Sequence, residues 1–526
     1  MRHQERRLMR RRNSCAAPLP DQDTRASFFV PFPPNRWCIV KKALVALLGA
    51  LVLVATVAII RTLQFASRQP QVAPVATEPL DSLALAGRLA GAVRFRTISY
   101  QDSSQFDAPE FDGLHRYLRD SFPRLHATLA LEKVNGYGLL YRWAGSDSSL
   151  APILLLAHQD VVPVEPGTEG RWTEPPFAGR IAAGFVWGRG ALDDKGSLLA
   201  LLEAVEHLIA AGAHPRRTVY LAFGYDEEVG GRRGAARIAA LLQSRGVHPA
   251  FVLDEGGALV DGLVPGVGVA VALLGIAEKG YVTVELTAQA EGGHSSMPPP
   301  QTAIGLLAAA LTRLESQQMP IAIRGPTAAM FDYLGPELPF GARLVMANRW
   351  LLGGVLANQL GASPQGRALL RTTTAPTVVQ AGVKENVLPS TARALVNFRI
   401  LPGDSVGGVV EHVRDVVHDS RITVRALPTT VSDPSPVASP ESESFQLLAR
   451  IIRQVVPGTV VTPWLVVGAT DSRHYASLTP NVYRFAGIRI GQDDLKRIHG
   501  TDERVGVGAY VDAVRIYVQL LRDGAM

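Results

Sequence analysis

Residues 153–160 read ILLLAHQD, in which five apolar residues are followed by a histidine, a glutamine and an aspartate. A short run that is apolar at every position is typical of a central strand in a parallel sheet, where both faces are buried. Strand-like runs recur at residues 218–223 and 250–253, and apolar residues at helical spacing occupy residues 198–209 and 234–242. This alternation predicts an α/β fold with an open, mostly parallel sheet and helices on both faces.

Residues that can bind metal ions follow each of these strands. His158 and Asp160 follow the first, Glu227 and Glu228 follow the second within the motif DEEVGG, and Asp254 ends the third. Sites in open α/β sheets form at the carboxyl ends of the strands, so we expect these side chains to lie close together. Imidazole nitrogen and carboxylate oxygen are ligands that zinc binds at catalytic sites.

Two further candidates lie outside the strands. Asp193 stands in GRGALDDKGS, directly before a predicted helix, and His499 stands in RIHG near the end of the chain. Each candidate has a simpler explanation when taken alone. Asp193 or Asp194 would cap the helix that follows, the paired glutamates would form a solvated turn, and a single histidine would be structural. Taken together, the carboxylates and histidines favour a site for a pair of metal ions, because clustered carboxylates repel one another without a cation.

The charge of the chain is unevenly distributed. The formal net charge is +6, but residues 1–42 hold ten Lys or Arg and three Asp or Glu, so residues 43–526 sum to −1. A folded part without excess positive charge argues against nucleic-acid binding. Both cysteines, Cys15 and Cys38, lie before residue 43. The remainder therefore folds without disulfide bonds, and any metal site in it must be built from His, Asp and Glu.

Residues 43–60, ALVALLGALVLVATVAII, form an apolar run bracketed by Lys41, Lys42 and Arg61. Its eighteen residues are at the lower limit for crossing a bilayer and exceed a usual signal-peptide core. No small-x-small cleavage site directly ends the run, which favours an uncleaved membrane anchor over a cleaved signal. The basic flank predicts that the N-terminus stays in the cytoplasm and that the catalytic part is exported to the periplasmic or extracellular side. A cleaved segment would instead give a secreted protein.

After residue 280 the pattern changes to that of a small α+β domain of βαββαβ order. Its strands are expected at residues 282–286, 373–381, 392–400 and 422–427, and its helices at residues 304–314 and 405–418. The expected organisation has six segments, namely a basic N-terminal segment (1–42), a membrane anchor or signal segment (43–60), a linker (61–80), the first part of a catalytic domain (81–280), an inserted domain (281–428) and the second part of the catalytic domain (429–526).

The motifs and their order resemble the zinc aminoacylase and carboxypeptidase family, which includes carnosine dipeptidases and succinyl-diaminopimelate desuccinylase. The resemblance covers about residues 80–526 and rests on LLLAHQDVVPV, WTEPPFAGRI, VWGRGALDDKGS, DEEVGG, LDEGG, GGHSSMPP, NVLPSTARALVNFRILPG, GATDSRHY and KRIHGTDE. Within the family, LLQSRGV and RTTTAPTVVQAGVKENVLP look closest to the secreted N-fatty-acyl-amino-acid synthase/hydrolase branch. Carboxypeptidase S, a membrane-anchored vacuolar enzyme, is the next nearest branch.

The resemblance implies a zinc-peptidase-like catalytic domain with two Zn²⁺ per subunit. His158 and Asp254 would bind one ion. Glu228 and His499 would bind the other, and Asp193 would bridge the two ions.

The resemblance also implies roles for residues that do not bind metal. Glu227 would act as the general base, and Asp160 would orient the imidazole of His158. The inserted domain would serve as a lid and a dimerisation domain. From it, His294 and Asn386 would reach the active site of a partner subunit in a homodimer and stabilise the oxyanion. Arg473 would receive the substrate carboxylate.

We therefore predict a di-zinc amidohydrolase that cleaves, and at high product concentrations also forms, the amide bond of N-acyl amino acids with hydrophobic or fatty acyl groups. The apolar stretch at residues 319–370 would either line a groove for the acyl chain or pack a small core of its own. A membrane-anchored carboxypeptidase or dipeptidase of the same family is the alternative enzyme. The alternative from another class is a catalytically silent binding protein on the same fold, and the complete set of ligands and base argues against it.

Overall fold

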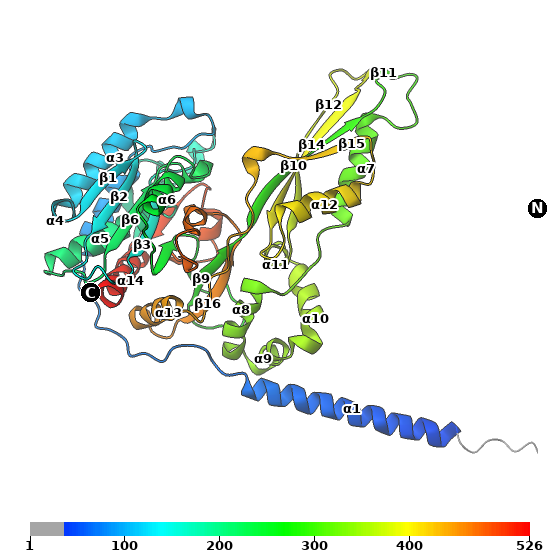
Figure 1. Cartoon of the computed structure of the whole chain (residues 1–526), viewed down its shortest axis with the longest axis horizontal. Helices are drawn as coiled ribbons and strands as arrows, with labels where there is room; N and C mark the ends of the chain where they lie inside the picture. Colours follow the sequence, from blue (N-terminus) through cyan, green and yellow to red (C-terminus); the bar gives the residue numbers. More distant parts are fainter. Residues whose placement is uncertain (1–35) are drawn as a thin grey trace, which may run out of the picture. The chain divides into compact units, whose positions relative to one another are not determined.

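A computed structural model describes residues 36–526 of the protein (Figure 1), and the chain divides after Val57 into two units. The first helix, α1 (Arg36–Gln64), runs across this boundary. Its residues Val40–Gln64 are long and apolar enough to cross a membrane, by length and composition. An apolar helix therefore lies where the sequence predicts one, while the choice between an anchor and a signal segment stays a prediction. Most of the predicted basic segment lies outside the described residues.

The second unit is built on a ten-stranded sheet of order β1-β2-β6-β3-β7-β17-β9-β8-β18, in which β16 also pairs with β9. Strands β3 (Ile153–His158), β6 (Val219–Gly224), β7 (Phe251–Asp254) and β17 (Val482–Arg484) form its parallel centre. The antiparallel strands β1 (Ala130–Val134) and β2 (Gly138–Trp143) form one edge. The other side contains β8 (Leu259–Val260), β9 (Val271–Glu278), β16 (Val460–Val466) and β18 (Arg489–Ile490). This mixed, mostly parallel sheet confirms the predicted fold class.

The central strand β3 is apolar at every position because helices cover both faces of the sheet. Ile153 and Leu155 join the main buried cluster, and Leu154 and Leu156 join a second cluster on the opposite face. Helix α6 (Ala235–Ser244) contributes to the second cluster. Helices that contribute to the main cluster include α2 (Ser82–Val93), α3 (Ala108–Ser121), α4 (Pro123–Thr128), α5 (Lys195–Ala210), α13 (Glu443–Val455) and α14 (Val507–Ala525).

The inserted domain has a four-stranded antiparallel sheet with its own buried core (Figure 1). The strand order is β12-β14-β10-β15, formed by β10 (Gly280–Gln289), β12 (Thr373–Ala381), β14 (Thr391–Ile400) and β15 (Ile422–Ala426). Helices α7 (Ala303–Ser316) and α12 (Val406–Val417) pack on this sheet and share its core. This order agrees with the predicted βαββαβ pattern. A ribbon of two-residue strands, β11 (Gly293–His294) and β13 (Val387–Leu388), was not predicted because so short a strand carries no periodicity.

Four helices occupy the apolar stretch at residues 319–370, for which the sequence allowed either a groove for an acyl chain or a separate core. They are α8 (Gly325–Leu334), α9 (Phe340–Ala347), α10 (Arg349–Gly361) and α11 (Pro364–Leu370). Helix α8 packs on β16, and Phe331 and Tyr333 belong to the main core. Leu356 of α10 also joins this core, whereas Phe340 and Trp350 are exposed to solvent. The stretch therefore does not pack a separate core, and part of its apolar surface faces outward.

A buried ion pair lies between β9 and β17. Arg484 donates from Nη2 to Oε1 of Glu278 over 2.8 Å, and from Nε to Oγ of Ser472 over 2.9 Å. Both side chains of the ion pair are at most 2% exposed. Glu278 also accepts a hydrogen bond from the backbone N–H of Thr470. The pair thus ties the loop that follows β16 to the centre of the sheet.

Removing one member of this pair should destabilise the protein strongly. Replacing Arg484 with methionine leaves the Glu278 carboxylate buried without its cation, so we expect the free energy of unfolding to fall by about 3–5 kcal/mol. Urea unfolding of the purified protein measures this loss. The matched control is Arg489→Met, which breaks an exposed pair with Asp261 and should change the free energy of unfolding by less than about 1 kcal/mol. Equal losses in the two variants would contradict the assignment.

Candidate metal centre

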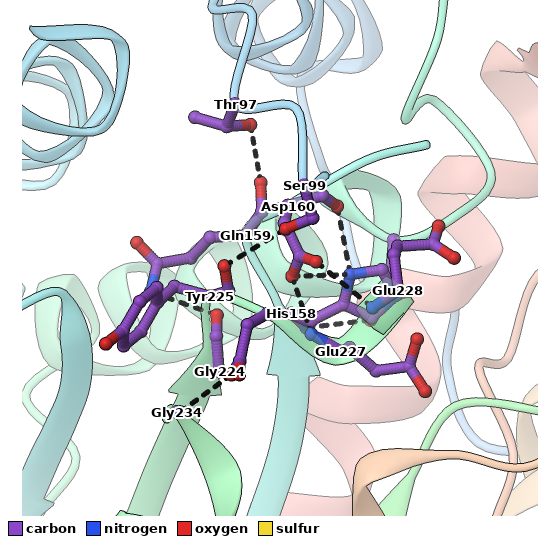
Figure 2. A network of polar contacts seen from close by, with 12 residues as sticks. Thr97, Ser99, His158, Gln159, Asp160, Gly224, Tyr225, Glu227, Glu228 and Gly234 are labelled. Carbon is purple, nitrogen blue, oxygen red and sulfur yellow. Dashed lines mark hydrogen bonds and ion pairs between the residues drawn. The ribbon is translucent and has the colours of Figure 1, made fainter. Parts of the chain in front are cut away.

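Parallel pairing brings residues that are distant in sequence to one edge of the sheet. Strands β6, β3 and β7 are neighbours, so the residues that follow His158, Gly224 and Asp254 start close together. After β6 the chain enters the short helix η3 (Glu227–Val229), which carries two of the predicted residues. Figure 2 shows His158 beside this helix. The predicted convergence at the carboxyl ends of the strands is present.

The carboxylate of Asp193 lies between two histidines. Its Oδ1 is 3.0 Å from Nε2 of His158, and its Oδ2 is 3.0 Å from Nε2 of His499. The same His499 nitrogen lies 3.2 Å from Oε2 of Glu228. Each oxygen of Asp193 therefore faces a different imidazole, which is the arrangement that a carboxylate bridging two metal ions requires.

Two groups of ligand atoms share Asp193. His158, Asp193 and Glu255 form one group, and Asp193, Glu228 and His499 form the other, with the ligand atoms of each group within 4.8 Å of one another. Among the described residues, Oε1 of Glu228 is buried and has no hydrogen-bond partner. Nitrogen and oxygen donors in groups of three, with an unpaired buried carboxylate oxygen, fit a pair of zinc ions that keep open positions.

The structure places Glu255, and not Asp254, with the other ligand atoms. Asp254 turns its Oδ2 to the backbone N–H of Ser472, which donates a hydrogen bond over 2.7 Å. Consecutive side chains of an extended chain point to opposite sides, so only one of the two residues can face Asp193. The grouping of ligand atoms therefore favours Glu255 over the predicted Asp254 as the ligand beside His158.

Asp160 fixes the orientation of both His158 and helix η3 (Figure 2). The backbone N–H groups of Glu227 and Glu228 donate to its two carboxylate oxygens, each over 3.1 Å. Nδ1 of His158 lies 3.0 Å from the backbone oxygen of Asp160 and 3.5 Å from its Oδ1. A proton held on Nδ1 by these acceptors leaves Nε2 free to face Asp193 and a metal ion.

The loop that carries Asp193 is held by a residue that the sequence did not single out. Glu503 accepts hydrogen bonds at Oε1 from the backbone N–H groups of Gly190, Leu192 and Asp193, and its other oxygen pairs with Arg189. Glu503 stands four residues after His499 in the motif KRIHGTDE. Its position in this motif was the feature of the sequence that could have identified it as a site residue. Asp194, the residue directly after Asp193, precedes α5, and its side chain makes no hydrogen bond that caps this helix. Capping therefore does not explain the paired aspartates.

The protonation of the cluster reflects its excess of negative charge. Burial alone would lower the pKa of His158, but its contacts with Asp160 and Asp193 outweigh burial and raise it well above the usual value. Hydrogen bonds with Asp193 and Glu228 raise the pKa of His499 to about 10. Burial and the nearby Asp193 raise the pKa values of Glu228 and Glu255. Cations that bind here would therefore replace protons, as expected of a metal site.

Glu227 lies next to these ligands without belonging to either group. Burial, followed by the negative charges of Asp471 and Glu228, raises the pKa of Glu227 well above its usual value. Asp471 itself is buried, and neither of its carboxylate oxygens has a hydrogen-bond partner among the described residues. A partly buried carboxyl group with a raised pKa beside a metal site is suited to accept a proton and return it.

The predicted residues of the inserted domain lie apart from this cluster. His294 is exposed on β11, where its Nδ1 is 2.8 Å from Oγ of Ser296, and Asn386 adjoins the paired strand β13. Figure 1 shows β11 at the end of the inserted domain that is distant from the main sheet. The single chain therefore does not bring His294 and Asn386 to Asp193.

A second arginine accompanies the predicted Arg473. Arg399 of β14 lies over the ring of Tyr281, 4.6 Å from its centroid. Burial lowers the pKa of Arg399, and the positive charge of Arg473 contributes to this shift. Among the described residues neither arginine forms an ion pair, so the two cations together can receive an anion. Arg399 was not predicted as a site residue, although it stands within the motif NFRILPG.

Comparison with known proteins places this centre in a family. The sequence pattern of peptidase family M20/M25/M40 matches residues 154–523. The chain is 41% identical over 475 residues to the probable carboxypeptidase S-like 2 of Dictyostelium discoideum, covering 88% of this chain and 91% of that protein. It is also 41% identical over 439 residues to the N-fatty-acyl-amino acid synthase/hydrolase PM20D1 of Xenopus tropicalis, covering 83% and 85% of the two chains.

A solved structure shares the fold. The M20 family metallo-carboxypeptidase Sso-CP2 from Sulfolobus solfataricus superposes with a TM-score of 0.59 at 18% identity, covering 84% of this chain and 99% of that chain. The chain belongs to the peptidase family M20/M25/M40, and it is a hydrolase that acts on amide bonds.

Proposed function

We propose that the protein is a di-zinc amidohydrolase that cleaves N-acyl amino acids with hydrophobic or fatty acyl groups. The observation that carries this proposal is the carboxylate of Asp193, which faces His158 with one oxygen and His499 with the other. Partly buried Glu227, whose pKa is raised, lies next to the ligands Glu228 and His158 (Figure 2). A catalytically silent binding protein would have no need for a base next to two groups of metal ligands.

The metal ligands follow from the two groups that share Asp193. His158 and Glu255 would hold one ion, and Glu228 and His499 would hold the other. When bound, the two ions act as Lewis acids that polarise the amide carbonyl and make a water molecule more acidic.

Glu227 accepts the proton of the attacking water at its carboxylate and later donates it to the nitrogen of the leaving amine. Asp160 keeps helix η3 in place through its hydrogen bonds to the N–H groups of Glu227 and Glu228. It thereby fixes the base and one ligand relative to His158. His294 and Asn386, which stand exposed on the inserted domain, would complete the active site of a second copy of the chain and stabilise the oxyanion. A homodimer formed through the inserted domain (281–428) follows from this assignment.

The substrate class follows from the pair of unpaired arginines. Arg399 and Arg473 would bind the carboxylate that lies next to the scissile amide. N-fatty-acyl amino acids and the C-terminal residues of peptides both carry such a carboxylate, and the names of the two relatives cover both classes. Fatty acyl groups are proposed because of the second relative, and synthesis would require high concentrations of amine and fatty acid. A carboxypeptidase is the second candidate. Hydrolysis of a blocked dipeptide faster than of N-oleoyl-phenylalanine would favour it.

The apolar helix α1 would anchor the protein. We propose that residues 43–60 cross a membrane and leave the catalytic part (81–280 and 429–526) on the exported side. The helix contains an apolar stretch of sufficient length, and Lys41 and Lys42 precede the apolar residues on the side expected to stay in the cytoplasm. Recovery of the mature protein with residue 43 removed would show that the segment is a cleaved signal instead.

The choice between Glu255 and Asp254 is tested by metal content. Replacing Glu255 with glutamine removes a charged ligand from one group, so we expect the zinc content after dialysis to fall from about two ions per chain to about one. Atomic emission spectroscopy measures it. Asp254→Asn is the matched control and should keep both ions, because Asp254 faces Ser472. Loss of zinc from the control with full content in Glu255→Gln would restore Asp254 as the ligand.

The role of the base is tested by Glu227→Gln. The amide cannot take a proton from water, so kcat on N-oleoyl-phenylalanine should fall by about 10²–10⁴-fold. Zinc content should stay at the wild-type level, since Glu227 belongs to neither ligand group. Turnover within a few-fold of wild type would show that another residue is the base.

The carboxylate site is tested by Arg399→Met. Loss of one charge-assisted contact should raise KM for N-oleoyl-phenylalanine by about 10–100-fold, with a smaller effect on the slow hydrolysis of its primary amide, which lacks the carboxylate. Steady-state kinetics of fatty acid release measures both. Arg425→Met, which changes an exposed arginine paired with Glu285 on the inserted domain, should leave KM unchanged. An unchanged KM in Arg399→Met would remove this arginine from the substrate site.

A further inference from the structure

The outer surface of α9 and α10 is apolar although it faces solvent. Phe340 and Trp350 are each 56% exposed, Leu351 is 48% exposed and Val355 is 66% exposed. Residues 340–362 contain no acidic residue. On α10, residues 351 and 355 are four apart, so they lie on one side of the helix. We refer to these four side chains as the α9–α10 face.

The two basic residues of this segment do not make the face polar. Arg349 is paired with Asp332 on α8, and Arg343 donates to the backbone oxygen of Pro336. Both guanidinium groups are thus turned toward the body of the protein. Large apolar side chains exposed on neighbouring helices are typical of a surface that contacts a partner or a membrane.

The same helices hold the last turns of α1. Asn348, which lies between α9 and α10 and is fully buried, donates from Nδ2 to the backbone oxygen of Ala58 over 3.0 Å and to Oγ1 of Thr62 over 3.2 Å. Nε of Arg61 donates to the backbone oxygen of Ala347. Leu63, in the same turns, is 72% exposed. All of these residues belong to the second unit, so the attachment does not depend on the direction that residues 36–57 take.

Because α1 is held against α9 and α10, a membrane that residues 43–60 cross would lie close to the α9–α10 face. The apolar span ends at Ile60, and the residues on either side of it, Ala58 and Thr62, are hydrogen-bonded to Asn348. If residues 43–60 cross a bilayer, the surface of that bilayer must lie close to Asn348, where α9 ends and α10 begins. Tryptophan at such a level sits at the boundary between headgroups and acyl chains, and an apolar helix face without charges can enter that boundary.

We propose that the α9–α10 face is inserted into the outer boundary of the lipid bilayer beside the anchor, with Phe340, Trp350, Leu351 and Val355 among the acyl chains. The proposal rests on the membrane anchor of the proposed function. It makes the insert a second attachment to the membrane, which would hold the catalytic unit at a fixed height above the lipid. A second copy of the chain is a different occupant, which the experiment below distinguishes from lipid.

A pair of valine positions provides a matched test. In a chain with Cys15→Ser and Cys38→Ser, Val355→Cys or Val383→Cys would carry a polarity-sensitive fluorophore, and the full-length protein would be placed in phosphatidylcholine nanodiscs. Val383 is 95% exposed on the inserted domain and does not belong to the α9–α10 face. We expect brominated phosphatidylcholine to quench the label at residue 355 several-fold more than the label at residue 383, which lies near Asn386 and the proposed dimer contact.

Each other outcome overturns a defined part of the account. Equal quenching at the two positions would contradict the inserted face while leaving the anchor intact. A blue-shifted label at residue 355 that brominated lipid does not quench would show that protein, such as a second copy, covers the face. Failure of the chain to enter nanodiscs would refute both the anchor and the face. Turnover of N-oleoyl-phenylalanine by the chain labelled at residue 355 tests the catalytic proposal separately.

Discussion

The carboxylate of Asp193, held between His158 and His499, is the contact on which the rest of the structure depends. The three residues come from the end of β3, from the loop before α5 and from the loop between β18 and β19 (Arg504–Gly506). A carboxylate that is only 16% exposed is unfavourable in such a position unless positive charge compensates for it. In the protein alone, protons on the histidines supply that charge, and metal ions would supply it in the loaded enzyme.

The residues behind the ligands explain how so much negative charge is kept in a fixed arrangement. Glu503 accepts hydrogen bonds from backbone N–H groups of the loop that carries Asp193, and Asp160 accepts them from helix η3. Asp254 performs a similar task with Ser472. These three carboxylates contact backbone groups and a neighbouring side chain rather than the open site. Such partners of metal ligands fix geometry as much as the ligands do.

Much of the fold could be predicted from the sequence, because the decisive patterns are local. The all-apolar run before His158 predicts a central strand, and the changed order after residue 280 predicts the inserted domain. The sequence could not decide between Asp254 and Glu255, since a shift of one residue at the end of a strand reverses the side that a side chain faces. Glu503 was missed because its partner Asp193 lies 310 residues away in sequence, and Arg399 because its role depends on the distant Arg473. The exposed apolar side chains of α9 and α10 could not be predicted either. The apolar composition of a stretch does not show whether its side chains face the core or solvent.

The central claim is that Asp193 bridges two metal ions. A crystal structure of the zinc-loaded protein, refined against anomalous differences at the zinc edge, tests it most directly. The account predicts two zinc ions about 3.5–4 Å apart, with one oxygen of Asp193 on each ion and Glu255 completing the group that contains His158. A single ion, or a pair in which Asp193 contacts only one, would contradict it.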